Sequence, residues 1–205
     1  NPEESYRVDA GINWQSKRLS VQIDPYFNYF TNYIYMNPTS NYYEGLQVYN
    51  YSQSEVMRWG CEVTMKYEWL SWMESELTGE YLYARQQSGE KKGYTLPFSR
   101  PWSAGLTLRV KSGEDETKGT SFAQLTYQLT GRQSEIVPPE KPTPGYYLIN
   151  MSAGKTWNLK GMTLTANMQC NNLLNRRYYD HTSYYRLIGV SEAGRNISVS
   201  VGLEF

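Results

Sequence analysis

The chain has 205 residues, and its 20 basic and 20 acidic side chains cancel to a formal net charge of zero. This neutral balance gives no electrostatic reason to expect a nucleic-acid partner. The mean hydropathy of -0.67 is hydrophilic, and the sequence has no run of about 18 apolar residues that would make a transmembrane helix. The unusual feature is aromatic, because 20 Tyr and 6 Trp accompany a single His.

Apolar and polar side chains alternate along most of the chain. In the first segment, Tyr6, Val8 and Ile12 alternate with Arg7 and Asp9, and a period of two is typical of a strand with two unlike faces. The same alternation occurs in segments 6–14, 19–29, 57–69, 77–83, 102–110, 123–129, 147–157, 162–170 and 197–205. We therefore predict an all-β fold, an antiparallel meander of about nine strands.

The last segment, 196–205, has the most regular alternation. Its apolar residues are Ile197, Val199, Val201, Leu203 and Phe205. Chain ends usually fray, so a regular strand that reaches the final residue suggests a strand that has to pair. The last strand of an outer-membrane barrel closes the barrel, because an open edge in lipid leaves backbone groups unsatisfied. We predict that Val201, Leu203 and Phe205 are a barrel-assembly signal.

The predicted connections alternate between short and long. Short ones occupy 16–18, 70–72, 111–119 and 158–160, and long ones occupy 31–54, 86–100, 131–145 and 175–195. Outer-membrane barrels have short periplasmic turns and longer extracellular loops. We therefore expect the long segments on the extracellular side and Phe205 on the periplasmic side.

A soluble β-sandwich would also alternate, but two features favour part of a transmembrane β-barrel. The apolar series begin and end on aromatics, as in Tyr6 to Trp14 and Tyr147 to Trp157. Eight to ten residues in a tilted strand span roughly 20–25 Å, which matches the apolar band of such barrels. The opposite face, which suits a wet or plugged lumen, carries Arg7, Asp9, Asp24, Arg58, Glu62, Lys66, Glu76 and Glu80.

The residues around the last predicted strand resemble the C-terminus of TonB-dependent outer-membrane receptors, in the branch that takes up metals, siderophores or haem. That family typically shows Asn-Leu-(Phe/Leu)-Asn, a Tyr soon after, then Gly-Arg and a closing strand. The matching residues here are Asn172, Leu173, Leu174, Asn175, Tyr178, Gly194, Arg195 and Phe205. Other weaker motifs extend the resemblance over essentially the whole chain.

The resemblance implies a domain organisation and a function. Family members have a plug domain and a barrel of about 22 strands, so residues 1–205 would be the C-terminal portion of a receptor barrel, with the plug domain absent. The implied function is a Gram-negative outer-membrane receptor that imports a scarce solute, an iron chelate, haem or other metal compound, with TonB-coupled energy. Its implied partners are outer-membrane lipid, the missing plug domain and remaining barrel strands, the TonB complex and the solute.

No catalytic residues, metal site or cofactor are predicted. Glu76 and Glu80 share a strand face, but a lumen wall that contacts a plug explains them better than acid–base catalysis does. Two other functions remain open. A passive porin would share the strands but not the Asn-Leu-Leu-Asn and Gly-Arg motifs, and a soluble carbohydrate-binding β-sandwich would explain the aromatics.

One predicted loop is a candidate for contact with the solute. Its candidate substrate-binding residues are Tyr178, Tyr179, His181, Tyr184, Tyr185 and Arg186. An imidazole or phenolate can ligate a metal, and aromatic rings can stack on a chelate. The alternative is a Tyr-rich extracellular rim with one surface His. A single His cannot form a metal site by itself.

Overall fold

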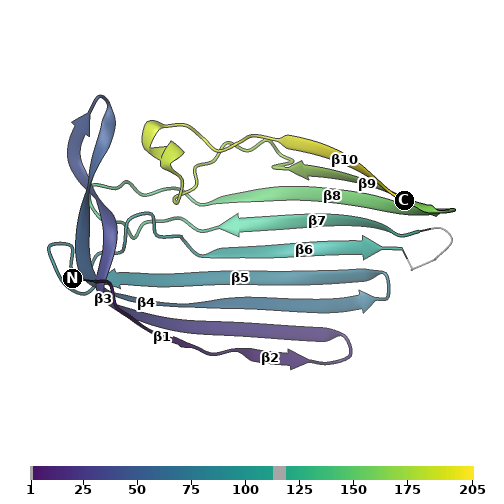
Figure 1. Ribbon diagram of the computed structural model, residues 1–205, viewed down its shortest axis with the longest axis horizontal. Coiled ribbons are helices and arrows are strands. Elements are labelled where there is room, and N and C mark those ends of the chain that lie inside the picture. The colour runs from purple at the N-terminus through teal and green to yellow at the C-terminus, as the bar shows by residue number, and fades with distance from the viewer. Residues whose placement is uncertain (1, 113–118) are drawn as a thin grey trace.

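The computed structural model describes residues 2–112 and 119–205 (Figure 1). They form one antiparallel sheet of ten strands in the order β1-β3-β4-β5-β6-β7-β8-β9-β10, with β2 also paired to β3. The strands are β1 (Ser5–Asp9), β2 (Ile12–Gln15), β3 (Leu19–Tyr43), β4 (Leu46–Leu70), β5 (Met73–Gln86), β6 (Ser103–Lys111), β7 (Ser121–Thr130), β8 (Tyr146–Leu159), β9 (Met162–Asn171) and β10 (Asn196–Glu204). The predicted all-β antiparallel meander is confirmed.

Only one helix occurs in these two ranges, the short 3-10 helix η1 (Tyr184–Ile188). No helix in the described part of the chain has the length and the hydropathy needed to cross a membrane.

The strands β1 and β2 together are the first predicted strand, so the ten segments occupy nine positions in the sheet. Asp9 pairs with Tyr26 and Ile12 pairs with Ile23, which is one continuous register against β3. The gap between them lies opposite Pro25, whose carbonyl accepts a hydrogen bond from the Ala10 N–H at 3.1 Å. Proline has no N–H to donate in return, so the ladder is interrupted at this point.

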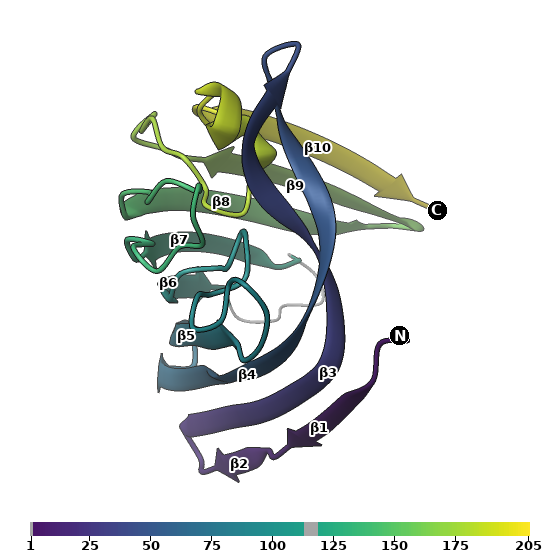
Figure 2. The ribbon, with the colours of Figure 1, turned by 90° about the vertical axis from the view of Figure 1, so that its left-hand side faces the viewer.

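The sheet is a single curved wall rather than two packed sheets. Figure 2 shows the strands side by side along this wall, with β1 and β2 at one edge and β10 at the other. The register places Val199 beside Met168 and Met168 beside Ala153, so apolar side chains form rows across neighbouring strands. Many large apolar side chains on this face are exposed, including Trp14, Leu106, Leu125 and Val201. This arrangement fits a barrel exterior and does not fit the core of a β-sandwich.

The predicted long loop at 31–54 is wrong. β3 and β4 continue as paired strands through this segment and are joined by a two-residue turn at Glu44 and Gly45, whose φ values are 49° and 80°. The register shifts between Phe30 and Tyr33 and again between Pro38 and Tyr42. Extra residues at a bulge change which face later residues occupy, so simple alternation fails there. We call residues 31–54 the extended hairpin; it rises away from the other strands in Figure 1.

The other connections follow the predicted asymmetry of length. Short turns at 16–18, 71–72 and 160–161 lie at one end of the strands, whereas the loops 87–102, 131–145 and 172–195 lie at the other (Figure 1). The predicted turn at 111–119 falls mostly on residues 113–118, which lie outside the described residues. All three long loops therefore gather at the end from which the extended hairpin rises.

The Asn-Leu-Leu-Asn motif lies between β9 and the loop 172–195. Asn172 and Asn175 both have a φ of 51°, a left-handed conformation that Asn tolerates better than most residues. The Asn172 side chain accepts a hydrogen bond from the Arg176 N–H at 2.8 Å and donates to the carbonyl of Ala193 at 3.3 Å. Asn175 Oδ1 accepts from the Arg195 N–H at 2.9 Å. The motif therefore fastens the two ends of the loop together, directly before β10.

The predicted assembly residues lie on and after β10. Val201 and Leu203 pair with Ala166 and Leu164 of β9, and Phe205 follows the last paired residue. All three side chains are exposed. The prediction that they act in barrel assembly stays a prediction.

Apolar side chains on the outward rows should be far more sensitive to charge than their polar neighbours. We expect Val199→Asp and Leu164→Asp to destabilise the full barrel by about 2 kcal/mol, because they would place a carboxylate on the face that we predict to contact lipid. Ser200→Asp and Thr165→Asp, which lie on the opposite face of the same two strands, should have mild effects. The amount of folded barrel in each of these variants is measured from its heat-modifiable band on gels. Equal loss at both pairs would mean that the register is wrong.

The two cysteines should remain free thiols under oxidising conditions. Both are free in the structure, Cys61 in β4 and Cys170 in β9, and β5, β6, β7 and β8 lie between those strands. Neighbouring strands are about 4.8 Å apart, so the thiols are beyond the reach of a disulfide. Mass spectrometry of an unreduced digest should find no peptide that links them, and such a linked peptide would contradict the strand order.

Candidate functional site

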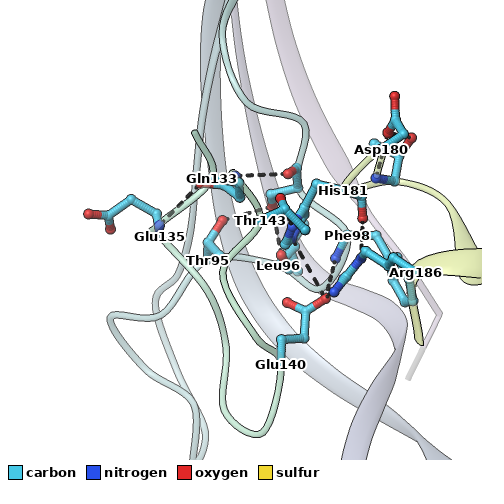
Figure 3. Close-up of polar contacts among 12 residues, drawn as sticks. Thr95, Leu96, Phe98, Gln133, Glu135, Glu140, Thr143, Asp180, His181 and Arg186 are labelled. Atoms are coloured by element: carbon cyan, nitrogen blue, oxygen red, sulfur yellow. Dashed lines mark hydrogen bonds and ion pairs between the residues drawn. The ribbon is translucent and has the colours of Figure 1, made fainter. Parts of the chain in front are cut away.

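The three long loops pack against one another at the end of the sheet, and we call residues 87–102, 131–145 and 172–195 the loop cluster. Figure 3 shows their polar contacts. The Gln133 side chain donates a hydrogen bond to the Ser99 carbonyl at 2.8 Å. Thr143 Oγ1 and His181 Nδ1 are 2.9 Å apart. Each loop is thus bonded to at least one of the others.

The first of these loops, 87–102, folds inward onto the strands. Gln86, which is buried, donates from Nε2 to the Thr95 carbonyl at 2.8 Å and accepts from the Tyr35 hydroxyl at 2.6 Å. Leu96 completes a small apolar cluster with Val56 and Ala84. The loop therefore covers the inner face of β4 and β5 where that face becomes apolar.

Glu140 lies at the centre of the loop cluster, and its side chain is only 1% exposed. Its Oε1 accepts a hydrogen bond from Arg186 Nη2 at 2.6 Å and another from the Phe98 N–H at 3.1 Å. Arg186 Nε donates to the His181 carbonyl at 2.7 Å. A buried charge is tolerated when it is paired and hydrogen-bonded, so this carboxylate joins all three loops.

His181 is buried beside this ion pair, with 2% of the residue exposed. Its Nε2 lies 3.9 Å from Glu140 Oε1 and has no hydrogen-bond partner among the described residues. Burial and the Arg186 guanidinium lower the pKa of His181 to about 4, although Asp180 raises it. The ring is therefore neutral near neutral pH.

The structure places the six predicted solute-contact residues in three pairs with different surroundings. His181 and Arg186 are buried or partly buried and hold the loops together. Tyr184 and Tyr185 are 52% and 59% exposed; both belong to η1, whose first turn is capped by the Ser183 side chain.

The two remaining tyrosines make contacts within the protein. The rings of Tyr178 and Tyr146 have centroids 4.4 Å apart. Burial, together with Glu192 and Asp180, raises the pKa of Tyr178, so its phenol stays protonated. The Tyr179 hydroxyl donates to the Gly189 carbonyl at 3.3 Å and accepts from Arg177 at 3.0 Å.

An open cavity of about 540 Å³ lies between the loop cluster, the extended hairpin and the inner face of β3 to β5. Its size falls within the usual range for small-molecule sites. Its walls include Tyr26, Tyr33, Ile34, Tyr35, Met36, Arg58, Glu80, Leu82, Ala84, Leu96, Pro97, Phe98, Ser99, Arg100, Thr182 and Tyr184. Of the predicted solute-contact residues, Tyr184 reaches this wall.

The cavity combines aromatic rings with two cations. The Phe98 and Tyr184 rings are in contact, with centroids 4.6 Å apart. Arg100 pairs with Glu80 at 3.2 Å, whereas the buried Nε of Arg58 has no hydrogen-bond partner within the described residues. Such a site suits an aromatic or anionic molecule. No three His, Cys, Asp or Glu side chains in the described ranges are placed to hold a metal ion.

Sequence reasoning missed Glu140 in the loop cluster, and it missed Phe98 and Arg58 in the cavity wall. Glu140 stands in the Pro-rich segment 137–144, where a charge normally faces solvent. Its partner Arg186 is 46 residues away, and no local pattern connects the two.

Lowering the pH should loosen the loop cluster. The folded-state pKa of His181, about 4, lies below the ordinary 6.5. The neutral His181 ring therefore contributes its full stabilisation of the folded loop cluster above about pH 6.5. As the pH falls towards 4, the ring is protonated and up to about 3 kcal/mol of folding free energy is lost. Amide hydrogen exchange in 131–145 and 172–195, corrected for intrinsic rates, measures this change. The non-titrating variant His181→Gln is the control, and an equal pH response in that variant would contradict the assignment.

Comparison with known proteins gives the family. Residues 1–173 match the family described as TonB dependent receptor-like, beta-barrel. Similar solved structures include the copper transporter OprC, with a TM-score of 0.80 at 15% identity over 98% of this chain and 31% of that one. BauA, the ferric preacinetobactin receptor from Acinetobacter baumannii, has a TM-score of 0.73 at 16% identity over 98% of this chain and 29% of that one.

A third similar structure is the FrpB iron transporter from Neisseria meningitidis, with a TM-score of 0.65 at 14% identity over 97% of this chain and 31% of that one. At these identities the structures show a common fold. The chain spans less than a third of the length of each of these three proteins. On the family match over residues 1–173, the chain belongs to the TonB-dependent receptor-like β-barrel family.

Proposed function

We propose that the chain is the C-terminal part of the barrel of an outer-membrane receptor that imports a metal-containing compound, with energy supplied through TonB. The observation that carries this proposal is the cavity at the loop end, with its aromatic walls and its two arginines. The family match supports a receptor or transporter, and the outward apolar rows on the sheet support a location in the outer membrane.

The chemistry of the cavity favours a chelated metal over a bare ion. Tyr33, Tyr35, Phe98 and Tyr184 offer faces for an aromatic chelator, and stacked aromatic rings attract one another beyond their buried area. Arg58, whose buried Nε has no hydrogen-bond partner among the described residues, suits an anionic complex, whereas Arg100 is already paired with Glu80. This chain contains a single His, and that His is buried, so within the described part of the chain a chelator is better suited than the side chains to supply the metal ligands.

The cargoes of similar proteins agree with this proposal. One is a copper transporter, one is a ferric preacinetobactin receptor and another is a ferric yersiniabactin uptake receptor from Yersinia pestis. These descriptions belong to those proteins. They support, for this chain, a metal compound as the solute.

The remaining partners follow from the same proposal. A plug domain and further strands would complete the barrel, because the edges of the sheet at β1/β2 and at β10 have no strand partner among the described residues. The polar inner face, with Glu62, Lys66 and Glu76, suits contact with such a plug. The TonB complex would act through a region outside this chain.

Among the predicted contact residues, Tyr184 is the one we propose to touch solute in the cavity. Tyr178, Tyr179 and Tyr185 would border the site. His181 and Arg186 would act indirectly, by holding the loops that form the wall.

Removal of the whole receptor should impair growth where metal is scarce. A strain that lacks the gene should grow poorly under metal limitation and normally when metal is plentiful, because high-affinity uptake is needed only in the first condition. Normal growth under limitation, combined with failure on one polysaccharide as sole carbon source, would instead support glycan import.

Replacing Tyr184 should weaken solute binding more than replacing Tyr94 does. The two side chains are similarly exposed, at 52% and 44%, but only Tyr184 lines the cavity. Loss of one aromatic contact corresponds to roughly a threefold to tenfold loss of affinity. Uptake by cells that express Tyr184→Ala or Tyr94→Ala measures the difference, and equal uptake by both strains would remove Tyr184 from the site.

A further inference from the structure

We propose that Glu140 is a positioning residue for solute binding, because its buried carboxylate sets the place of Phe98 and Tyr184 in the cavity wall. This inference rests on the proposed function, since it concerns the same cavity. Glu140 itself is not among the residues that line the cavity. Any effect of Glu140 on solute binding must therefore be indirect, through the positions of Phe98 and Tyr184.

The first link runs from Glu140 to the backbone of Phe98. Phe98 has a φ of 55°, a left-handed conformation that bulky residues adopt only when the surroundings impose it. Its N–H donates to Glu140 Oε1 at 3.1 Å. In this conformation the Phe98 ring lies between Tyr49 and Tyr184, at centroid distances of 6.2 and 4.6 Å. The carboxylate thus stabilises an unfavourable backbone geometry that places an aromatic ring in the wall.

The second link runs from Glu140 through Arg186 to η1. Arg186 Nη2 donates to Glu140 Oε1 at 2.6 Å, and Arg186 Nε donates to the His181 carbonyl at 2.7 Å. The guanidinium carbon also lies 5.0 Å from the centre of the Phe98 ring, within the range of a cation–π contact. Arg186 and Tyr184 belong to the same short helix. Fixing the guanidinium therefore fixes the helix that presents Tyr184.

The two links converge on a single oxygen atom. Oε1 accepts both hydrogen bonds, and Oε2 has no partner among the described residues. Loss of the carboxylate would release Phe98 and Arg186 together, and it would leave a buried guanidinium without a counter-charge. An amide at this position would still accept the Phe98 N–H but would no longer neutralise Arg186. This difference separates the two links experimentally.

The test uses the full-length receptor in detergent, with Glu140→Ala, Glu140→Gln and the control Glu135→Gln. Glu135 is on the same loop, its side chain is 67% exposed and it pairs with Arg85. Amide hydrogen exchange in 87–102 and 172–195 reports on Phe98 and η1 without any solute. Tryptophan quenching by the iron(III) complex of 2,3-dihydroxybenzoate reports binding of an anionic aromatic metal chelate.

We expect Glu140→Ala to speed exchange in both loops and to weaken chelate binding about tenfold. Glu140→Gln should keep protection at Phe98 and lose it around η1, and Glu135→Gln should match the wild type. Unchanged exchange at Phe98 in Glu140→Ala, or faster exchange with unaltered binding, would overturn the positioning role.

The two proposals fail in different ways. If the wild-type receptor does not bind the chelate and supports no metal uptake, the proposed function is refuted. The amide hydrogen exchange data would still decide whether Glu140 positions Phe98. If Glu140→Ala does not fold into a heat-modifiable barrel, Glu140→Gln carries the test through its selective loss of protection around η1. Equal loss of protection at Phe98 and η1 in that variant would overturn the two-link arrangement.

Discussion

Backbone pairing between strands that are neighbours in the sequence is the interaction on which this structure depends. Very few side chains in the described ranges are fully buried, and the buried apolar residues include Val56, Ala84, Leu96, Val137 and Cys170. The ladder of backbone hydrogen bonds therefore holds the strands together, as a compact apolar core does in other folds. Antiparallel pairing also determines where the connections lie, because consecutive strands run in opposite directions and successive connections therefore lie at opposite ends of the sheet. The three long loops must then meet at one end, and two of them, 87–102 and 172–195, contribute to the cavity wall.

That gathering of loops creates a second physical problem, because irregular backbone packed against other irregular backbone must still satisfy its polar groups. The structure solves it with buried polar side chains rather than with apolar ones. Gln86 and Gln133 donate hydrogen bonds to loop carbonyls. Glu140 accepts hydrogen bonds from the two other loops, through the Phe98 N–H and the Arg186 guanidinium. A cluster built in this way is specific in geometry, since each buried group needs its own partner. The same contacts that keep the loops folded also determine which rings face the cavity.

The sequence predicted the strands well where alternation is uninterrupted, because a two-faced strand leaves a simple period in the chain. It failed at the extended hairpin, where the bulge between Phe30 and Tyr33 reverses the face of later residues and the register shifts again between Pro38 and Tyr42, and where Tyr, Asn, Ser and Thr occupy both faces. The loop cluster was only partly predictable. The Tyr-rich segment after Asn175 was predicted to contact solute, and this stays a prediction. The burial of His181 was not predictable, because it depends on Thr143 and Glu140, which come from another loop. Contacts of that kind leave no periodic signal, and only the folded arrangement reveals them.

The Asn-Leu-Leu-Asn motif connects the strand pairing with the packing of the loop cluster. Asn175 Oδ1 lies so close to Gly194 that an added Cβ there would meet it at 2.7 Å, and the next N–H, from Arg195, donates to it. A Cβ at this position would displace the Asn175 side chain, so the close approach favours glycine. It brings the end of the loop 172–195 beside its beginning just before β10 starts. With both ends fixed, the middle of the loop extends across the end of the sheet, where Arg186 meets Glu140. One short motif therefore sets the start of the last strand and also places the loop that builds the cavity wall. Correct pairing of β10 with β9 and correct assembly of the loop cluster are thus consequences of the same local geometry.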